Sequence, residues 1–405
     1  MADIVIRGGD VYDPDLPGIG RRDVFIRDGR FAAPFESSAT GSVIDAQGLL
    51  VTPGWVDLHT HVFVGQDLGV DPNRLAPATG VTTVIDTGSA GAHLYEAFLA
   101  AVAGAVPRVR AFLNISTIGT TSILLAGELR QLDYLDEAAC LEALRRHPEI
   151  IGVKVRASAN VGGDNTIEAL LRARRVADAA GRPLMVHIGP APVTYPDVLS
   201  LLRAGDIVTH CFTGHSDFPL VDPAGGADVL ESALAARERG VLFDVGHGGG
   251  SFDAARAAAA IRAGFLPDTI SSDVHAYADQ PEGGDLPAAG LPASAADSLV
   301  AGGLPLVVDK FLALGMSLEQ VLSRVTASPA AAAGLTSLGA GSLRLGAPAD
   351  LAVYRLVEGP LTLRDPQGFT FHGERSIRPV LTVQSGTVVF DRRTAPAGAD
   401  VLTEG

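Results

Sequence analysis

Two histidines close in sequence, His59 and His61, follow an apolar run that begins near Trp55. Side chains two residues apart on a β-strand point to the same face, so we expect both imidazole rings to face one point. Imidazole nitrogens are good ligands for borderline-soft divalent metal ions such as zinc. A pair of buried, hydrogen-bonded histidines explains the same spacing, so these two residues alone leave both interpretations open.

Four further apolar runs carry a polar residue of a type that can bind metal ions. They are Lys154 in GVKVRAS, His187 in MVHIGPAP, His210 in VTHCFTG and Asp273 in ISSDVHAY. A lone histidine at the end of a strand is also compatible with an ordinary core position. The six residues together need one shared explanation, and a site for two metal ions supplies it.

Lys154 is the least usual member of this set, because an unpaired ammonium group is costly to bury. Burial lowers the pKa of a lysine and favours the neutral amine. A neutral amine can add carbon dioxide to form a carbamate, whose two oxygens can bridge two cations. The alternative is a salt bridge to an acid such as Asp57 or Asp86, and the sequence keeps both open.

The elements that must position these residues alternate regularly from about Trp55 to Leu335. Short β-branched runs alternate with amphipathic segments, such as 165–181 and 228–240, which each end in a glycine suited to a left-handed cap. Eight such strands with intervening helices predict a (β/α)8 barrel, in which chemistry lies at the carboxyl ends of the strands. A doubly wound open sheet is the alternative, but no glycine-rich phosphate-binding motif supports it.

The two ends of the chain contain strand and turn patterns, such as DVFIRDGRFAAPF and RPVLTVQSGTVVFD. We therefore expect residues 1–52 and 336–405 to combine in a small β-sandwich beside a barrel of residues 53–335. Two long segments that follow predicted barrel strands, 216–226 and 279–292, are expected to cover the site.

The composition limits the class of protein. The 405 residues are 47% hydrophobic and 19% charged, which provides for a sizeable core and excludes disorder over most of the length. A net charge of -15 argues against nucleic-acid and anionic-membrane partners. No run approaches the roughly 18 apolar residues of a membrane span, and no signal peptide is visible. With two cysteines, Cys140 and Cys211, we expect a cytoplasmic protein, and a homo-oligomer is compatible with the sequence.

These residues and their flanks carry a family resemblance. The six-residue set resembles the binuclear, carbamylated-lysine branch of the amidohydrolase superfamily, and VTPGWVDLHTHVF and GAPADLAVY resemble segments of that superfamily. More narrowly, GVKVRAS, VTHCFTG and DVGHGGGSF resemble its deacetylase-type metallohydrolases. The resemblance implies an enzyme that removes an acyl group from a small N-acyl or O-acyl carboxylic acid.

The resemblance also implies a ligand set for two divalent ions, zinc by default, with manganese, iron or cobalt as substitutes. One ion goes to His59, His61 and Asp273, the second to His187 and His210, and carbamylated Lys154 bridges the two. A hydroxide shared by the ions would attack the substrate carbonyl. Asp273 would accept its proton and pass it to the leaving nitrogen or oxygen.

Substrate contacts are expected from residues near this set. Arg156, two residues past Lys154, is predicted to bind a substrate carboxylate, and a pairing with a loop carboxylate is the alternative. His275, His247 and Gly248 are further candidates, the last through its backbone N–H in a glycine-rich turn.

Two positions separate this chain from other branches. Dihydroorotases that resemble this pattern carry Arg where this chain has Phe63, and mononuclear deaminases carry Glu where it has Pro190. Together with the resemblance to deacetylase-type metallohydrolases, these departures favour a hydrolase of an acetyl-type group. The alternatives are a cyclic-amide hydrolase of the dihydroorotase or hydantoinase type and a non-catalytic barrel that serves in assembly.

Overall fold

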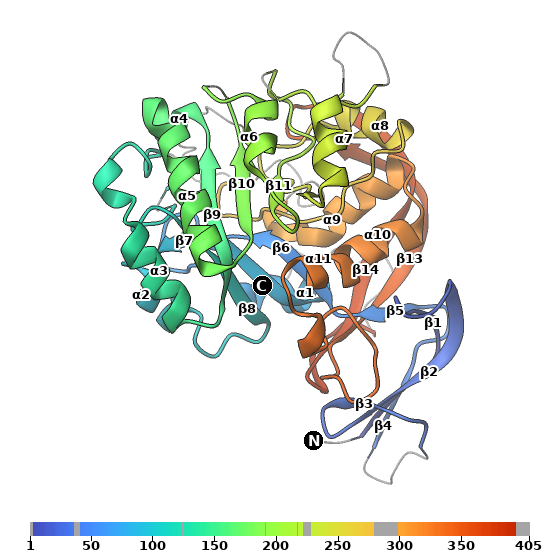
Figure 1. The fold of residues 1–405 in the computed structure, drawn as a ribbon. Helices are drawn as coiled ribbons and strands as arrows, with labels where there is room; N and C mark the ends of the chain where they lie inside the picture. The colour runs from blue at the N-terminus through green and yellow to red at the C-terminus, as the bar shows by residue number, and fades with distance from the viewer. Residues whose placement is uncertain are drawn as a thin grey trace.

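A computed structural model describes residues 3–35, 41–120, 122–123, 125–190, 192–216, 218–221, 228–278 and 299–393. Two sheets and the helices around them form this part of the chain (Figure 1). The loop predicted at 279–292 lies outside the described residues, as do residues 217 and 222–226 of the other predicted loop. No helix of the described residues has the length and apolarity needed to cross a membrane.

Seven parallel strands form one sheet and lie side by side in chain order. They are β6 (Trp55–Thr60), β7 (Val81–Gly91), β8 (Arg108–Asn114), β9 (Ile150–Ala157), β10 (Leu184–Ile188), β11 (Ile207–Thr209) and β12 (Leu242–Phe243). Every residue of β6, β7 and β9 is buried, because both faces of the sheet are covered. This burial explains why these strands appear in the sequence as continuous apolar runs.

Residues 269–275, predicted as the eighth strand, contact both edges of this sheet. Thr269 forms a parallel bridge with Asp244, which follows β12. Val274 forms a parallel bridge with Thr60 at the end of β6. The segment therefore forms one isolated bridge at each edge of a curled parallel sheet, in place of a continuous strand.

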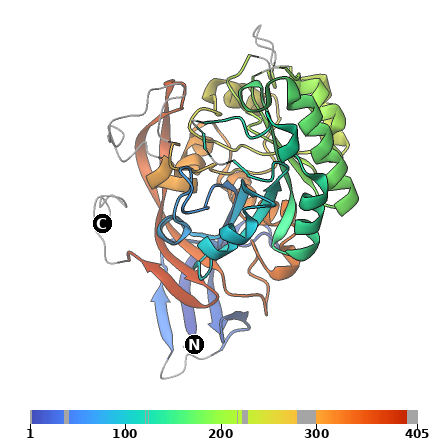
Figure 2. The ribbon, with the colours of Figure 1, turned by 90° about the vertical axis from the view of Figure 1, so that its left-hand side faces the viewer.

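Helices lie around this sheet, and Figure 2 shows several of them side by side. They are α1 (Pro72–Thr79), α2 (Tyr95–Ala101), α3 (Glu137–Arg146), α4 (Ala159–Gly162), α5 (Thr166–Ala180), α6 (Tyr195–Leu201), α7 (Glu231–Glu238), α8 (Ala254–Arg262), α9 (Leu299–Ala313), α10 (Leu318–Val325) and α11 (Ala327–Ala332). The helix predicted at 165–181 is confirmed as α5, which is capped by Gly181 at φ 61°. The helix predicted at 228–240 begins later, because Val229 forms an isolated bridge before α7 starts.

The two ends of the chain meet in a second sheet, as predicted. Its order is β15 (Thr387–Asp391), β14 (Thr370–Gln384), β13 (Leu351–Arg364), β5 (Leu50–Pro53), β1 (Ile4–Tyr12), β2 (Ile19–Arg27) and β3 (Arg30–Ala32), and β4 (Ser42–Asp45) also pairs with β1. Because β5 pairs with both β1 and β13, the strands form one connected eight-stranded sheet, and its packing as a β-sandwich stays a prediction. Figures 1 and 2 show these blue and red strands beside each other. The domain limits at 52/53 and 335/336 stay predictions.

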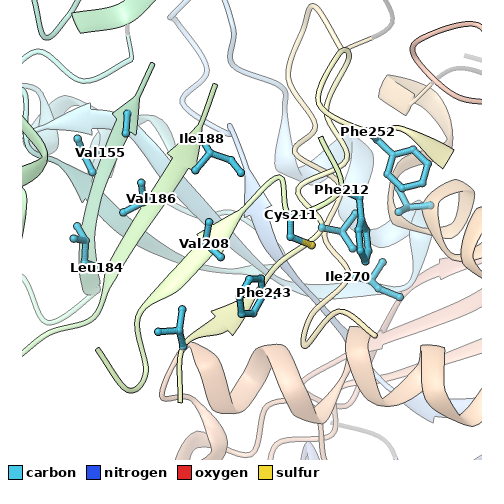
Figure 3. Packing of buried hydrophobic residues seen from close by; sticks show 14 of the residues in the cluster. Val155, Leu184, Val186, Ile188, Val208, Cys211, Phe212, Phe243, Phe252 and Ile270 are labelled. Atoms are coloured by element: carbon cyan, nitrogen blue, oxygen red, sulfur yellow. The ribbon is translucent and has the colours of Figure 1, made fainter. Parts of the chain in front are cut away.

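The core between the parallel sheet and its helices fixes which side chains face the other way. Val155, Val186 and Val208 point into this core from β9, β10 and β11 (Figure 3). Successive side chains of a strand alternate between faces, so Lys154 and His187 lie on the opposite side.

Candidate metal centre

Three predicted ligands meet at one point. His59 and His61 direct their Nε2 atoms at the same carboxylate oxygen, Asp273 Oδ1, at 3.1 and 3.3 Å. Asp273 is held there because its backbone N–H donates to the carbonyl of His59 at 2.7 Å. Ligand atoms of His59, His210 and Asp273 all lie within 4.8 Å of one another and could hold a metal ion.

His187 and His210 lie beside each other, with ring centroids 4.4 Å apart at an interplanar angle of 82°. His210 Nδ1 lies 2.7 Å from the carbonyl of Gly246, and because a carbonyl only accepts, the ring proton is on Nδ1. His210 Nε2 is buried and has no hydrogen-bond partner among the described residues. A buried lone pair without a donor is what a metal ligand requires, so this residue fits the centre.

Lys154 is buried at 1% exposure, on the same side of the sheet as these histidines. Its Nζ lies 3.2 Å from His59 Nε2 and 3.5 Å from Met185 Sδ. The ion pairs found within the described ranges do not include Lys154, so the alternative of a salt bridge to Asp57 or Asp86 is not observed there. Burial lowers the pKa of Lys154 to about 7, which makes the neutral amine accessible near neutral pH.

Burial also sets the protonation state of the imidazoles. Removal from water disfavours the charged ring, so it lowers the pKa of His61 and His210 to about 4. It lowers the pKa of His59 and His187 well below the ordinary value. All four rings are neutral at pH 7, which is the form that binds metal ions.

The backbone is strained at two of the predicted ligands. His210 has φ 65° and Asp273 has φ 49°, in a region that non-glycine residues rarely adopt. Among the described non-glycine residues, only Asp28 and Ser385 share this property. Such conformations cost about 1–3 kcal/mol each and cluster at functional sites. Here they turn both side chains toward the centre as the chain leaves the sheet.

Two hydroxyl groups that the sequence did not single out hold the outer nitrogens of the first histidine pair. His59 Nδ1 lies 2.9 Å from Thr209 Oγ1, and His61 Nδ1 lies 2.8 Å from Ser89 Oγ. Thr209 directly precedes His210 at a strand end, and Ser89 lies near the end of β7. Their positions at strand ends were the available signal, but which ring each would contact depends on the packing of strands far apart in sequence.

Arg156 has a carboxylate partner in this structure. Its Nε and Nη2 donate to Glu128 Oε1 and Oε2 at 2.7 and 2.9 Å, and both side chains are buried. This is the pairing with a loop carboxylate that the sequence left open. Glu128 was not predicted. The contact of Arg156 with a substrate stays a prediction.

The other predicted substrate contacts divide into two groups. His275 lies near the centre, with its ring centroid 6.1 Å from that of His61. His247 uses both ring nitrogens within the protein, Nδ1 with the carbonyl of Gly248 and Nε2 with Lys310 Nζ, each at 2.9 Å. The N–H of Gly248 donates to the carbonyl of Ser272 at 3.0 Å. In this structure, the polar atoms of His247 and Gly248 are therefore engaged with protein groups.

The sequence of this chain is similar to a known protein family and to named proteins. The amidohydrolase family model matches residues 50–389. A deacetylase from Agrobacterium fabrum is 32% identical over 375 residues, which cover 91% of this chain and 86% of that protein. A deacetylase from Enterococcus faecalis is 32% identical over 360 residues, which cover 88% and 91%.

Solved structures of other proteins align with nearly the whole chain. A crystal structure of an adenine deaminase and one of a dihydroorotase both align with a TM-score of 0.84, at 29% and 30% identity. Each alignment covers 96% of this chain, with 100% and 98% of the respective neighbour. The family match and the relatives named deacetylase support a hydrolase that acts on amide bonds. The chain belongs to the amidohydrolase family.

Proposed function

We propose that the protein is a metal-dependent hydrolase that removes an acetyl-type acyl group from a small N-acyl or O-acyl carboxylic acid. The observation that carries this proposal is the convergence of His59, His61 and Asp273 beside Lys154, a buried lysine with no carboxylate partner among the described residues. Relatives named deacetylase, 32% identical over most of the chain, support the acyl group as the part removed.

The proposed ligand set follows the donor atoms. His59, His61 and Asp273 would hold one divalent ion, His187 and His210 a second, and Lys154 would bridge both as a carbamate. Nitrogen and carboxylate-type oxygen donors favour zinc. When bound, a pair of divalent ions would lower the pKa of a bound water molecule and polarise the substrate carbonyl.

The remaining steps belong to side chains. Asp273 would take a proton from the attacking water through Oδ2, because Oδ1 faces His59 and His61 and no hydrogen bond to Oδ2 is found among the described residues. Asp273 would return the proton to the leaving nitrogen or oxygen. Arg156 Nη1, which takes no part in the pair with Glu128, would bind the substrate carboxylate. His275, His247 and Gly248 would shape the rest of the pocket.

Two further proposals, one on the fold and one on the cellular location, accompany this function. Residues 269–275 would act as the eighth strand and complete a (β/α)8 barrel, supported by their bridges to both sheet edges. A cytoplasmic location is supported by two buried cysteines, Cys140 and Cys211, that form no disulfide.

A second candidate is hydrolysis of a cyclic amide, which the aligned dihydroorotase structure favours. Against it, the position where dihydroorotases of this pattern carry Arg is occupied by Phe63. This ring is buried and packs edge-on against Phe98, with centroids 5.6 Å apart. It therefore serves the core and offers no group for a substrate carboxylate.

The test combines metal analysis with a substrate screen. Purified protein is expected to contain about two transition-metal ions per chain. Zinc-loaded protein is screened against N-acetyl amino acids of both hands, O-acetyl hydroxy acids, cyclic amides and adenine. Release of acetate from an acylated acid is the expected result. Preferred opening of a cyclic amide would establish the second candidate, and persistent absence of metal would overturn both.

A further inference from the structure

A chain of hydrogen bonds runs from His59 away from the centre to a buried carboxylate. His59 Nδ1 lies 2.9 Å from Thr209 Oγ1, which lies 2.7 Å from Asp244 Oδ2. Asp244 is fully buried. A hydroxyl group has one proton, and a carboxylate only accepts, so Thr209 donates to Asp244 and must accept from His59. The ring proton of His59 is therefore on Nδ1.

This tautomer matters because it leaves the lone pair of His59 on Nε2. That nitrogen lies 3.1 Å from Asp273 Oδ1 and 3.2 Å from Lys154 Nζ, at the centre of the candidate site. The opposite tautomer would place a proton where a ligand lone pair is needed. The hydroxyl of Thr209 thus selects the form of His59 that can bind a cation.

The side-chain carboxylate of Asp244, where this series of hydrogen bonds ends, is held only by hydroxyl groups. It has no lysine or arginine partner among the described residues. Thr269 Oγ1 donates to Asp244 Oδ1 at 2.6 Å, and Ser271 Oγ lies 2.8 Å from both oxygens. The ion pair found for it among the described residues is with His59 itself, with Nδ1 3.8 Å from Oδ2. A positive charge at the centre would therefore compensate this buried negative charge.

We propose that Thr209 and Asp244 are positioning residues for the metal centre: Thr209 fixes the tautomer of His59, and Asp244 transmits negative charge through it to the bound ion. This inference rests on the metal centre of the proposed function. Groups behind a metal-bound histidine orient the ring and raise its basicity, and their loss weakens metal binding by about 10–100-fold.

The experiment compares three substitutions at the two threonines whose hydroxyl groups contact Asp244. Thr209→Val removes the hydroxyl that contacts His59, Thr209→Ser keeps it, and Thr269→Val removes a hydroxyl that contacts Asp244 but not His59. The apparent zinc dissociation constant is measured by competition with a chelator, and thermal unfolding verifies folding. We expect Thr209→Val to bind zinc about 10–100-fold more weakly, and the other two variants to bind it like the wild type.

A second measurement does not depend on metal. In metal-free, 15N-histidine-labelled protein, the ring nitrogens of His59 should report the Nδ1–H form in the wild type and a mixture of tautomers in Thr209→Val. If Thr209→Val does not fold, Asp244→Asn removes the charge at nearly constant shape and should also weaken zinc binding.

The outcomes separate the two proposals. Wild-type protein that binds no zinc would overturn the proposed function, while the tautomer measurement would still test the role of Thr209. Wild-type protein that binds zinc, with Thr209→Val equally tight or Thr269→Val equally impaired, would overturn only the positioning role.

Discussion

At the scale of single residues, the centre contains polar groups that would each be costly to bury alone. A lysine whose neutral form is accessible near neutral pH, neutral imidazoles and one carboxylate lie close together, and their side chains are largely buried. Isolated, each polar group would lose hydration without compensation. Cations at the centre would give every one of these lone pairs a partner, so the energetic cost of the arrangement is removed when metal binds.

Lys154 gives the first prediction. Lys154→Ala should abolish turnover, because no carbamate can form at an alanine. Small carboxylic acids such as acetate should restore part of the activity, since a carboxylate can occupy the space of the carbamate. Initial rates with and without added acid measure both effects. Full activity of the variant without added acid would contradict the bridging role.

Arg156 gives the second prediction. Arg156→Met should raise KM for carboxylated substrates far more than for neutral esters, because only the former need a guanidinium partner. Glu128→Gln is the matched control, since it weakens the same buried pair and leaves the guanidinium in place. If both variants raise KM for both substrate classes equally, the pair is structural and binds no substrate.

At the scale of elements, the loop after β12 brings backbone close to the site. Gly246 has φ 47°, and a Cβ there would lie 2.2 Å from Thr209 Oγ1 and 2.9 Å from His210 Nδ1. This close approach lets the Gly246 carbonyl reach the ring of His210. A glycine is therefore needed for space as well as for conformation.

The third prediction separates these two needs. Gly246→Ala should lower the free energy of unfolding and also weaken zinc binding, because the new methyl group displaces the Thr209 and His210 side chains. Gly264→Ala is the matched control, since it has φ 81° with nothing near its Cβ position. It should lose only about 1–2 kcal/mol of stability from backbone strain. Equal zinc affinity in the two variants, measured by chelator competition, would argue against the close approach.

Local patterns predicted the elements better than their connections. The apolar runs of β9 and β10 and the glycine end of α5 were visible because burial and capping leave a signature in consecutive residues. The connection of the flanking strands into one sheet was not visible in the sequence, because it depends on β5 pairing with strands from both chain ends. The contact between Thr209 and His59 joins residues 150 positions apart, so no local pattern specifies it.

At the scale of the whole molecule, the parallel sheet and the flanking sheet are linked through α9. Asp309 on this helix accepts a hydrogen bond from Ile377 N at 2.7 Å and pairs with Arg378 Nη1 at 2.7 Å, both at β14. Near α8, Gln367 Nε2 donates to the carbonyl of Gly250 at 2.8 Å. The flanking sheet therefore supports the helices and the glycine-rich turn that surround the centre.

The Asp309 link yields the last prediction. Burial raises the pKa of Asp309 to about 6, in spite of Arg378, from an ordinary value of about 3.9. The folded state thus prefers the protonated acid, and this contribution to stability is full below about pH 4 and is lost as pH rises through about 6. Asp309→Asn resembles the protonated acid at every pH. The free energy of unfolding of Asp309→Asn, relative to that of the wild type, should therefore rise by about 2–3 kcal/mol from pH 4 to pH 8.

Urea unfolding of both proteins at these two pH values measures that difference, in which the titration of all other groups cancels. Glu358→Gln is the matched control on the same sheet, because Glu358 forms an exposed pair with Arg375. Exposed pairs contribute about 0–1 kcal/mol, so its stability relative to the wild type should change little. A pH-independent difference for Asp309→Asn would mean that the pKa of Asp309 is the same in the folded and unfolded states. The attraction of Arg378 would then balance the cost of burying the carboxylate, and the contact between α9 and the flanking sheet would not weaken as pH rises through about 6.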